Sequence, residues 1–293
     1  MAGFSGFNRN NRLNTIGKNV SITKGVAFPS GGSTYTSNGS QYRVYQGSGT
    51  IDAQSPDPAT ISYNPRSRVI KSNDVGAKVD LLLCAGGGGG QPAQYHGGGG
   101  GGGVVYSENV ELPTSENISI SIGGNEQNSQ FGPLAQAIGG GRGTHDTGPS
   151  AGSGGSGGGG AFRPNNFRPA NGGGSGTQPS QPGISGSDGH GSPGRPAPSH
   201  GDQGGNGGGA GGQNGSSHQV PETFLPTTHP GFPSPFMGAA QGDSYYRSWG
   251  GGGRGQKYGT SSNIPSPSTP GRGKGADGGP WSGGSGACII RVV

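Results

Sequence analysis

The stretch VDLLLCAGGGGG at residues 79–90 decides the fold, because an apolar run passes directly into glycines. Apolar residues at consecutive positions are typical of a β-strand that is buried on both faces. The end of the chain, ACIIRVV at residues 287–293, is a second run of the same kind. Such strands need partners in a sheet, and each run is the natural partner of the other. We therefore expect the two runs to pair.

The composition is incompatible with an ordinary globular core. The chain has 293 residues, of which 72 are glycine and only 25% are hydrophobic. This composition alone favours disorder, and glycine loses more backbone entropy on folding than any other residue. Extended helices with three residues per turn offer a way to offset that cost. Glycine lets their backbones approach closely enough for N–H and C=O groups of neighbouring helices to bond.

These patterns predict an all-β protein with essentially no α-helix, in which the glycine segments pack as a bundle of polyglycine II helices. Residues 1–40 are interpreted as an N-terminal docking arm and residues 41–293 as the glycine-rich domain. The clearest strand is ISISI at 118–122, whose isoleucines and serines alternate between two faces. Residues 131–138 are expected to form one further strand. No α-helix is expected anywhere, because glycine and proline recur too often.

The order of these segments resembles the glycine-rich domain common in bacteriophage tail-fibre and other virion surface proteins. It is also similar to the glycine-rich module of some animal receptor kinases. The segments that carry the resemblance are residues 79–90, 97–105, 118–124, 131–132, 137–141 and 284–292. The resemblance covers about residues 41–293. It implies a small glycine-rich β-sandwich from which polyglycine helices project, with the loops between them contacting a host receptor.

The polar N-terminal segment carries a few apolar side chains, which is typical of a segment that orders on a partner. These proposed anchors are Phe4, Phe7, Leu13 and Ile16. We expect this arm to dock on other virion proteins, with the chain present as a homo-oligomer or in several copies.

The longest glycine-poor stretch of the second half contains the aromatic residues Phe232, Phe236, Tyr245, Tyr246 and Trp249. One interpretation is a contact surface for a partner subunit, a host surface protein or a glycan, since aromatic residues often dominate binding. The other interpretation is that this stretch caps the glycine bundle and packs on itself. The sequence leaves both open.

The two cysteines, Cys84 and Cys288, lie within the two apolar runs and have no metal-type spacing. They are either two buried free thiols or one disulfide that joins the first strand to the last. The six histidines lie in segments rich in glycine, proline and serine, without the spacing of metal ligands. We therefore expect no enzyme activity, no catalytic or metal site and no cofactor.

The expected function is that of a structural virion surface protein, a tail-fibre or fibre-tip component that attaches the particle to its host. Decoration of the capsid or tail is the alternative, and an extracellular ligand-binding or matrix module is the alternative of another class. The formal charge of +5 is scattered, so no nucleic-acid binding is expected. No signal peptide or membrane-length apolar stretch is recognised, and the protein is expected on the virion surface after synthesis in the host cytoplasm.

Overall fold

The computed structural model describes the sheets and most of the glycine segments. The described residues are 33–37, 40–45, 49–52, 78–91, 96–112, 117–145, 150–163, 168–169, 172–178, 188–198, 204–212, 215–216, 218–219, 221, 224, 248–253, 255, 273–276 and 282–292. Within these ranges the elements are β-strands and none is an α-helix or a 3₁₀-helix, which confirms the predicted all-β class.

The larger sheet has six strands in the order β1-β2-β14-β4-β5-β11. Their bounds are β1 Ser33–Ser37, β2 Ser40–Tyr45, β4 Lys78–Cys84, β5 Val104–Glu111, β11 Asp188–His190 and β14 Ala287–Val292. Strand β14 runs antiparallel to β4 along its whole length, from Ala287 opposite Cys84 to Val292 opposite Val79. The predicted pairing of the two apolar runs is therefore confirmed. Strand β1 falls within the first 40 residues, so part of the segment interpreted as an arm belongs to this sheet.

The smaller sheet has four strands in the order β3-β6-β7-β8. Their bounds are β3 Gly49–Asp52, β6 Asn117–Ser121, β7 Ser129–Phe131 and β8 Ala135–Ala137. The alternation predicted for 118–122 holds in β6, where Ile118 and Ile120 are buried and Ser119 is exposed. The single strand expected over 131–138 is wrong. Gly132 has a φ of +48°, which turns the chain and makes β7 and β8 a hairpin.

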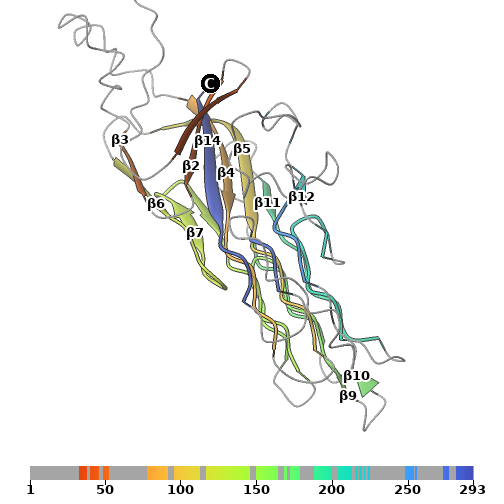
Figure 1. Cartoon of the computed structure of the whole chain (residues 1–293). Coiled ribbons are helices and arrows are strands. Elements are labelled where there is room, and N and C mark those ends of the chain that lie inside the picture. The colour runs from red at the N-terminus through yellow and green to blue at the C-terminus, as the bar shows by residue number, and fades with distance from the viewer. Residues whose placement is uncertain are drawn as a thin grey trace, which may run out of the picture.

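The hydrophobic core lies between the two sheets, so the predicted sandwich is present. Strand β4 contributes Leu81 and Leu83 to this core, while Leu82 and Cys84 face the other side of the sheet. Both sides are covered, and every β4 residue after Lys78 is buried, as expected for a central strand. Figure 1 shows β14, β4 and β5 side by side, with β6 and β7 in the second layer.

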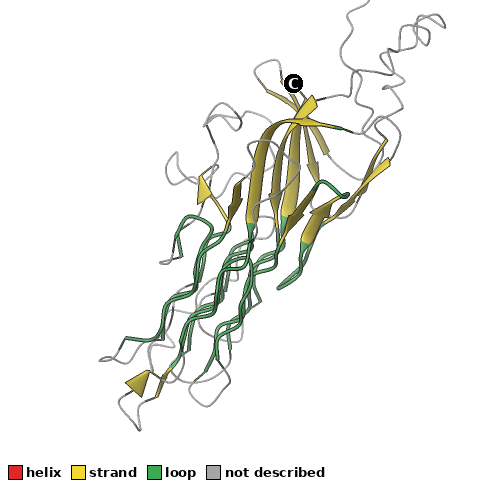
Figure 2. Ribbon diagram, turned by 180° about the vertical axis from the view of Figure 1, so that it is seen from behind, coloured by secondary structure: helices red, strands yellow, loops and turns green. Residues whose placement is uncertain are grey.

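The glycine segments continue the strands as a bundle that extends away from the sheets. In Figure 2 these segments run roughly alongside one another below the strands. The C-terminal end of the chain lies at the sheet end of the molecule, and two short strands lie at the far end of the bundle (Figure 1). These are β9 Phe162–Arg163 and β10 Arg168–Pro169, and another short pair is formed by β12 His218–Gln219 and β13 Ser248–Trp249.

The central segment of the bundle, residues 97–103, has hydrogen bonds that repeat every third residue. Its N–H groups bond in turn to three different neighbours. The N–H groups at 97, 100 and 103 donate to the carbonyls at 144, 141 and 138, respectively. The N–H groups at 98 and 101 donate to the carbonyls at 205 and 208. The N–H groups at 99 and 102 donate to the carbonyls at 276 and 273. This period is that of a helix with three residues per turn, so residues 97–103 form the predicted polyglycine II type of helix.

The carbonyl groups of the same helix accept from three further segments. The carbonyls at 98 and 101 accept hydrogen bonds from the N–H groups at 159 and 156, respectively. The carbonyls at 100 and 103 accept from the N–H groups at 88 and 85, and the carbonyl at 99 accepts from the N–H group at 253. Three segments on the donor side and three on the acceptor side surround residues 97–103. All seven N–H groups and five of the seven carbonyls of the central helix thus bond to backbone groups of neighbouring segments, without any side chain.

Candidate functional site

The sequence-based site residues fall largely outside the described part of the chain. The proposed anchors Phe4, Phe7, Leu13 and Ile16 lie there, and so do Phe232, Phe236, Tyr245 and Tyr246. Trp249 is described at the end of β13, where it is 1% exposed in the cluster on the outer face of the larger sheet. A side chain at that depth packs in the interior and is not available to a partner that approaches from solvent.

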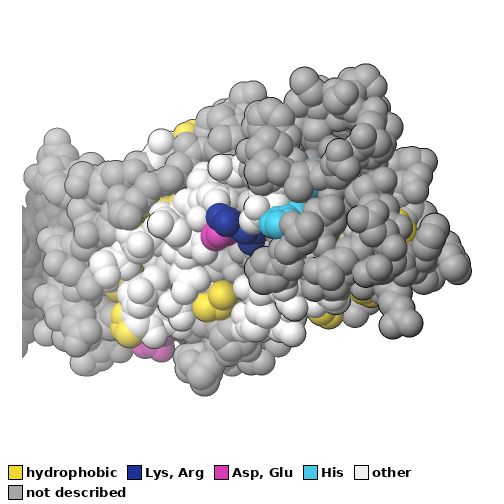
Figure 3. All heavy atoms as spheres, turned by 90° about the horizontal axis from the view of Figure 1, so that it is seen from below, with side chains coloured by type: hydrophobic (Ala, Val, Ile, Leu, Met, Phe, Trp, Pro, Cys, Tyr) yellow, Lys and Arg dark blue, Asp and Glu magenta, His cyan; other side chains and the backbone are white. Residues whose placement is uncertain are grey.

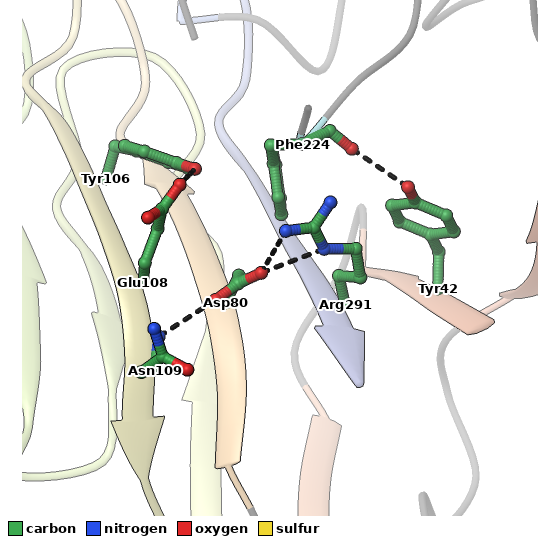
Figure 4. A network of polar contacts seen from close by, with 7 residues as sticks. All are labelled: Tyr42, Asp80, Tyr106, Glu108, Asn109, Phe224 and Arg291. Atoms are coloured by element: carbon green, nitrogen blue, oxygen red, sulfur yellow. Dashed lines mark hydrogen bonds and ion pairs between the residues drawn. The ribbon is translucent and has the colours of Figure 1, made fainter. Parts of the chain in front are cut away.

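The outer face of the larger sheet carries a network of polar and aromatic side chains that the sequence analysis did not identify. Figure 4 shows Tyr42, Asp80, Tyr106 and Arg291 projecting from four neighbouring strands toward Phe224. Phe224 is fully buried and comes from a segment far away in the sequence. Its ring meets the edges of Tyr42 and Tyr106, with centroids 6.3 and 5.2 Å apart, and Tyr42 donates a 2.9 Å hydrogen bond to its carbonyl.

Asp80 and Arg291 form an ion pair at the centre of this network. The Arg291 Nε donates a 2.8 Å hydrogen bond to Asp80 Oδ2, and a second guanidinium nitrogen donates to the same oxygen. Asp80 is 2% exposed, and the Arg291 guanidinium lies 5.4 Å from the centre of the Phe224 ring. Burial acts to lower the pKa of Arg291, but the hydrogen bonds and charge of Asp80 outweigh it, so the pKa is raised.

Asp80 also explains an irregularity in the sheet. The pairing of β4 with β5 shifts between Val79 and Leu81, so that two residues of β5 lie opposite the single residue Asp80. One of them, Asn109, has a φ of +54°, and its N–H donates a 2.8 Å hydrogen bond to Asp80 Oδ1. The carboxylate thus replaces the ladder partner that the β-bulge removes. The sequence held a signal for this pair, since each apolar run contains one charged residue and the two charges are opposite.

Tyr106 closes the network on the β5 side. Its hydroxyl donates a 2.7 Å hydrogen bond to Glu108 Oε1. Burial, followed by the hydrogen bond and charge of Glu108, raises the pKa of Tyr106 well above its ordinary value. These contacts hold Phe224 against the outer face of the larger sheet. The network therefore attaches to the sheet a residue that is far from its strands in the sequence.

The two cysteines point to opposite faces of the larger sheet. Cys288 lies opposite Leu83 and joins the core between the sheets, whereas Cys84 lies opposite Ala287 and joins the outer cluster. Neither cysteine is in a disulfide, and both are buried. The disulfide interpretation is therefore wrong, because the side chains of neighbouring positions in a strand project to opposite sides. Burial raises the pKa of Cys84 to about 12 and also raises that of Cys288.

These buried acidic groups predict a loss of stability at alkaline pH. Burial also raises the pKa of Tyr45 to about 12, from an ordinary value of 10.0. Below pH 8 the two thiols and the Tyr45 phenol are protonated in both the folded and the unfolded protein. Above about pH 9 the unfolded chain releases protons that the folded chain keeps, so the free energy of unfolding falls as the pH rises toward 12. Melting temperatures measured from pH 7 to 11 should decline accordingly.

The double variant Cys84→Ala/Cys288→Ala is the control for this prediction. It should lose stability at pH 7 through the lost packing, but its melting temperature should decline less steeply with pH. In the parent protein, iodoacetamide at pH 8 should modify neither thiol unless denaturant is added. Rapid alkylation of the native protein, or equal pH slopes for parent and variant, would contradict the burial of these thiols.

Neither a metal-binding group of side chains nor a membrane-spanning helix is found among the described residues. Within them no group of three or more histidine, cysteine, aspartate or glutamate side chains is placed to hold a metal ion. No helix in this part of the chain has the length and apolar character needed to cross a membrane. Seen from below in Figure 3, the described surface is mostly uncharged, with a few charged side chains near its middle.

The bundle itself is the other candidate functional element. Its backbones pack so closely that no side chain fits at many of its glycine positions. A Cβ atom at Gly97, Gly99 or Gly101 would lie 1.8 to 2.1 Å from a backbone oxygen of a neighbouring segment. Real Cβ atoms do not approach so closely, so these positions admit glycine alone. The segments between the glycine-dense stretches are richer in proline and serine and carry most of the aromatic residues of the second half of the sequence.

Comparison with known proteins gives one match. A family model described as a glycine-rich domain matches residues 62–293, which is most of the chain. The matched range includes β4 and β14 and all the glycine segments of the bundle. No curated protein and no solved structure matches this chain.

Proposed function

The chain belongs to the glycine-rich domain family, and from this premise we propose that it is a structural virion surface protein. In this proposal it is a component of a bacteriophage tail fibre or fibre tip and attaches the particle to its host. The observation that carries the proposal is the hydrogen-bonded glycine bundle. A fold held by backbone groups leaves the segments between its helices free to change, which suits a surface that must recognise variable receptors.

The proposal assigns separate tasks to the two ends of the sequence. The segment that precedes β1, with Phe4, Phe7, Leu13 and Ile16, docks on other virion proteins. The segment that contains Phe232, Phe236, Tyr245 and Tyr246 contacts a host surface protein or glycan. Trp249 is left out of this contact surface because it is buried. The chain acts without a cofactor and without enzyme activity.

The proposal is tested with particles of the virus that encodes this chain. Gold-labelled antibody to the purified protein should mark the fibres or their tips in electron micrographs of host-free particles. Simultaneous replacement of the four aromatic residues Phe232, Phe236, Tyr245 and Tyr246 by alanine should leave incorporation unchanged and slow adsorption to host cells at least tenfold.

A control variant and two outcomes complete this test. Arg142→Ala changes an exposed side chain of the bundle and should leave both incorporation and adsorption unchanged. Label on the capsid or tail, together with normal adsorption of the aromatic variant, would favour decoration of the particle. Absence of the protein from purified particles would reject a virion role and favour an extracellular module.

A further inference from the structure

Strand β1 forms one edge of the larger sheet, and its backbone polarity can be read from its register. Ser37 lies opposite Ser40, and two residues separate them in the sequence. In a hairpin with a two-residue connection, the pair next to the connection exchanges both backbone hydrogen bonds, and every second pair does the same. Ser33, Tyr35 and Ser37 therefore direct their N–H and C=O groups toward β2. Thr34 and Thr36 direct theirs away from the sheet.

In the part of the chain that the structure describes, β1 shows none of the features that usually protect an edge strand. The sequence of β1 contains no charged residue and no proline, and β1 pairs with β2 without a register shift. Ser33, Thr34 and Thr36 are exposed. The edge of the smaller sheet at β8 is treated differently. There the side-chain amide of Gln178 accepts a 2.8 Å hydrogen bond from the Ile138 N–H and donates one of 3.0 Å to the Gln136 carbonyl.

The sequence of β1, Ser-Thr-Tyr-Thr-Ser, reads the same in both directions. Two antiparallel copies related by a twofold axis at Tyr35 would place Ser33 opposite Ser37 and Thr34 opposite Thr36. In this register the hydrogen-bonded pairs are those of Thr34 and Thr36, whose backbone groups already point outward. The two Tyr35 residues would form a non-hydrogen-bonded pair, in which side chains are closest. Threonine pairs and aromatic pairs across strands both stabilise a sheet.

We propose that β1 pairs with β1 of a second copy of this chain about a twofold axis at Tyr35, which joins two six-stranded sheets into one. The outward backbone groups of Thr34 and Thr36 and the uncharged edge allow a further strand to pair with β1, and the self-complementary sequence favours a second copy as that strand. The inference concerns the purified chain and does not depend on the proposed virion role.

Cross-linking through a single engineered thiol tests the register. In the proposed dimer the two Tyr35 Cα atoms lie about 4.5 Å apart, which is within the range of a disulfide. Tyr35→Cys should therefore yield mostly disulfide-linked dimer after mild oxidation. Thr36→Cys is the matched control, because each residue at position 36 lies opposite position 34 of the partner and should cross-link at least fivefold less. The native thiols do not interfere, since Cys84 and Cys288 are buried.

Charge variants at the exposed threonines test the pairing without an engineered thiol. Light scattering after gel filtration should show twice the chain mass for the parent protein. The variants Thr34→Lys/Thr36→Lys and Thr34→Glu/Thr36→Glu should each be monomeric with unchanged circular dichroism. An equal mixture of the two should dimerise, because opposite charges then face each other. Three results would overturn the proposal. They are a monomeric parent protein, a dimer formed by the lysine variant alone or by the glutamate variant alone, and equal cross-linking at positions 35 and 36.

Discussion

Gly100→Ala should unfold or severely destabilise the protein. Its Cβ atom would lie 2.1 Å from the Ser156 carbonyl oxygen, and both its N–H and C=O groups are bonded to neighbouring glycine segments. The surrounding atoms are themselves backbone and are fixed by their own hydrogen bonds, so they cannot move aside singly. We expect a loss of about 3 kcal/mol or more, the upper part of the range for overpacked interiors.

Gly172→Ala is the matched control, because a Cβ atom at that position would meet nothing within 4 Å. Its φ also lies outside the left-handed region. The same chemical change should therefore alter stability by no more than about 1 kcal/mol, and a compatible glycine-to-alanine change often stabilises. Thermal melting and urea unfolding of both variants measure the difference. Equal melting temperatures for the two variants would disprove the close packing of residues 97–103.

Asp80→Ala should destabilise the protein by about 3 to 5 kcal/mol, the range for removal of one partner from a buried ion pair. The change leaves the Arg291 guanidinium without its carboxylate and also removes the acceptor of the Asn109 N–H. The double variant Asp80→Ala/Arg291→Met should recover part of this loss, since no charge is then left uncompensated. Urea unfolding of the single and double variants gives the coupling between the two residues.

The ion pair of Arg142 with Glu126 serves as the surface control for this prediction. Its N–O distance of 2.9 Å resembles that of Arg291 and Asp80, but the Arg142 side chain is 55% exposed. Arg142→Ala should therefore cost less than about 1 kcal/mol. If Asp80→Ala costs no more than Arg142→Ala, the network in Figure 4 does not contribute to stability as described.

The candidate site was only partly predictable. The sequence analysis chose aromatic residues of one glycine-poor stretch, and the structure places Trp249 from that set in the interior. The stretch begins at Phe224, which was not chosen as a contact residue, and the structure buries its ring against the outer face of the larger sheet. Composition cannot separate an aromatic residue that anchors a segment from one that faces solvent, because both occur in polar surroundings. That difference is decided by which side chains of distant strands lie beneath the ring.

The sequence by itself determined the class of the fold. Apolar runs such as 79–85 predict strands buried on both faces, the alternation at 118–122 predicts a strand buried on one face, and frequent glycine excludes α-helices. Only the tertiary structure decided which glycine segments surround residues 97–103, because one glycine offers the same N–H and C=O groups as any other. It also decided the faces of Cys84 and Cys288. Pairing Ala287 with Cys84 sends the two thiols to opposite sides, and a register shifted by one residue would have brought them together.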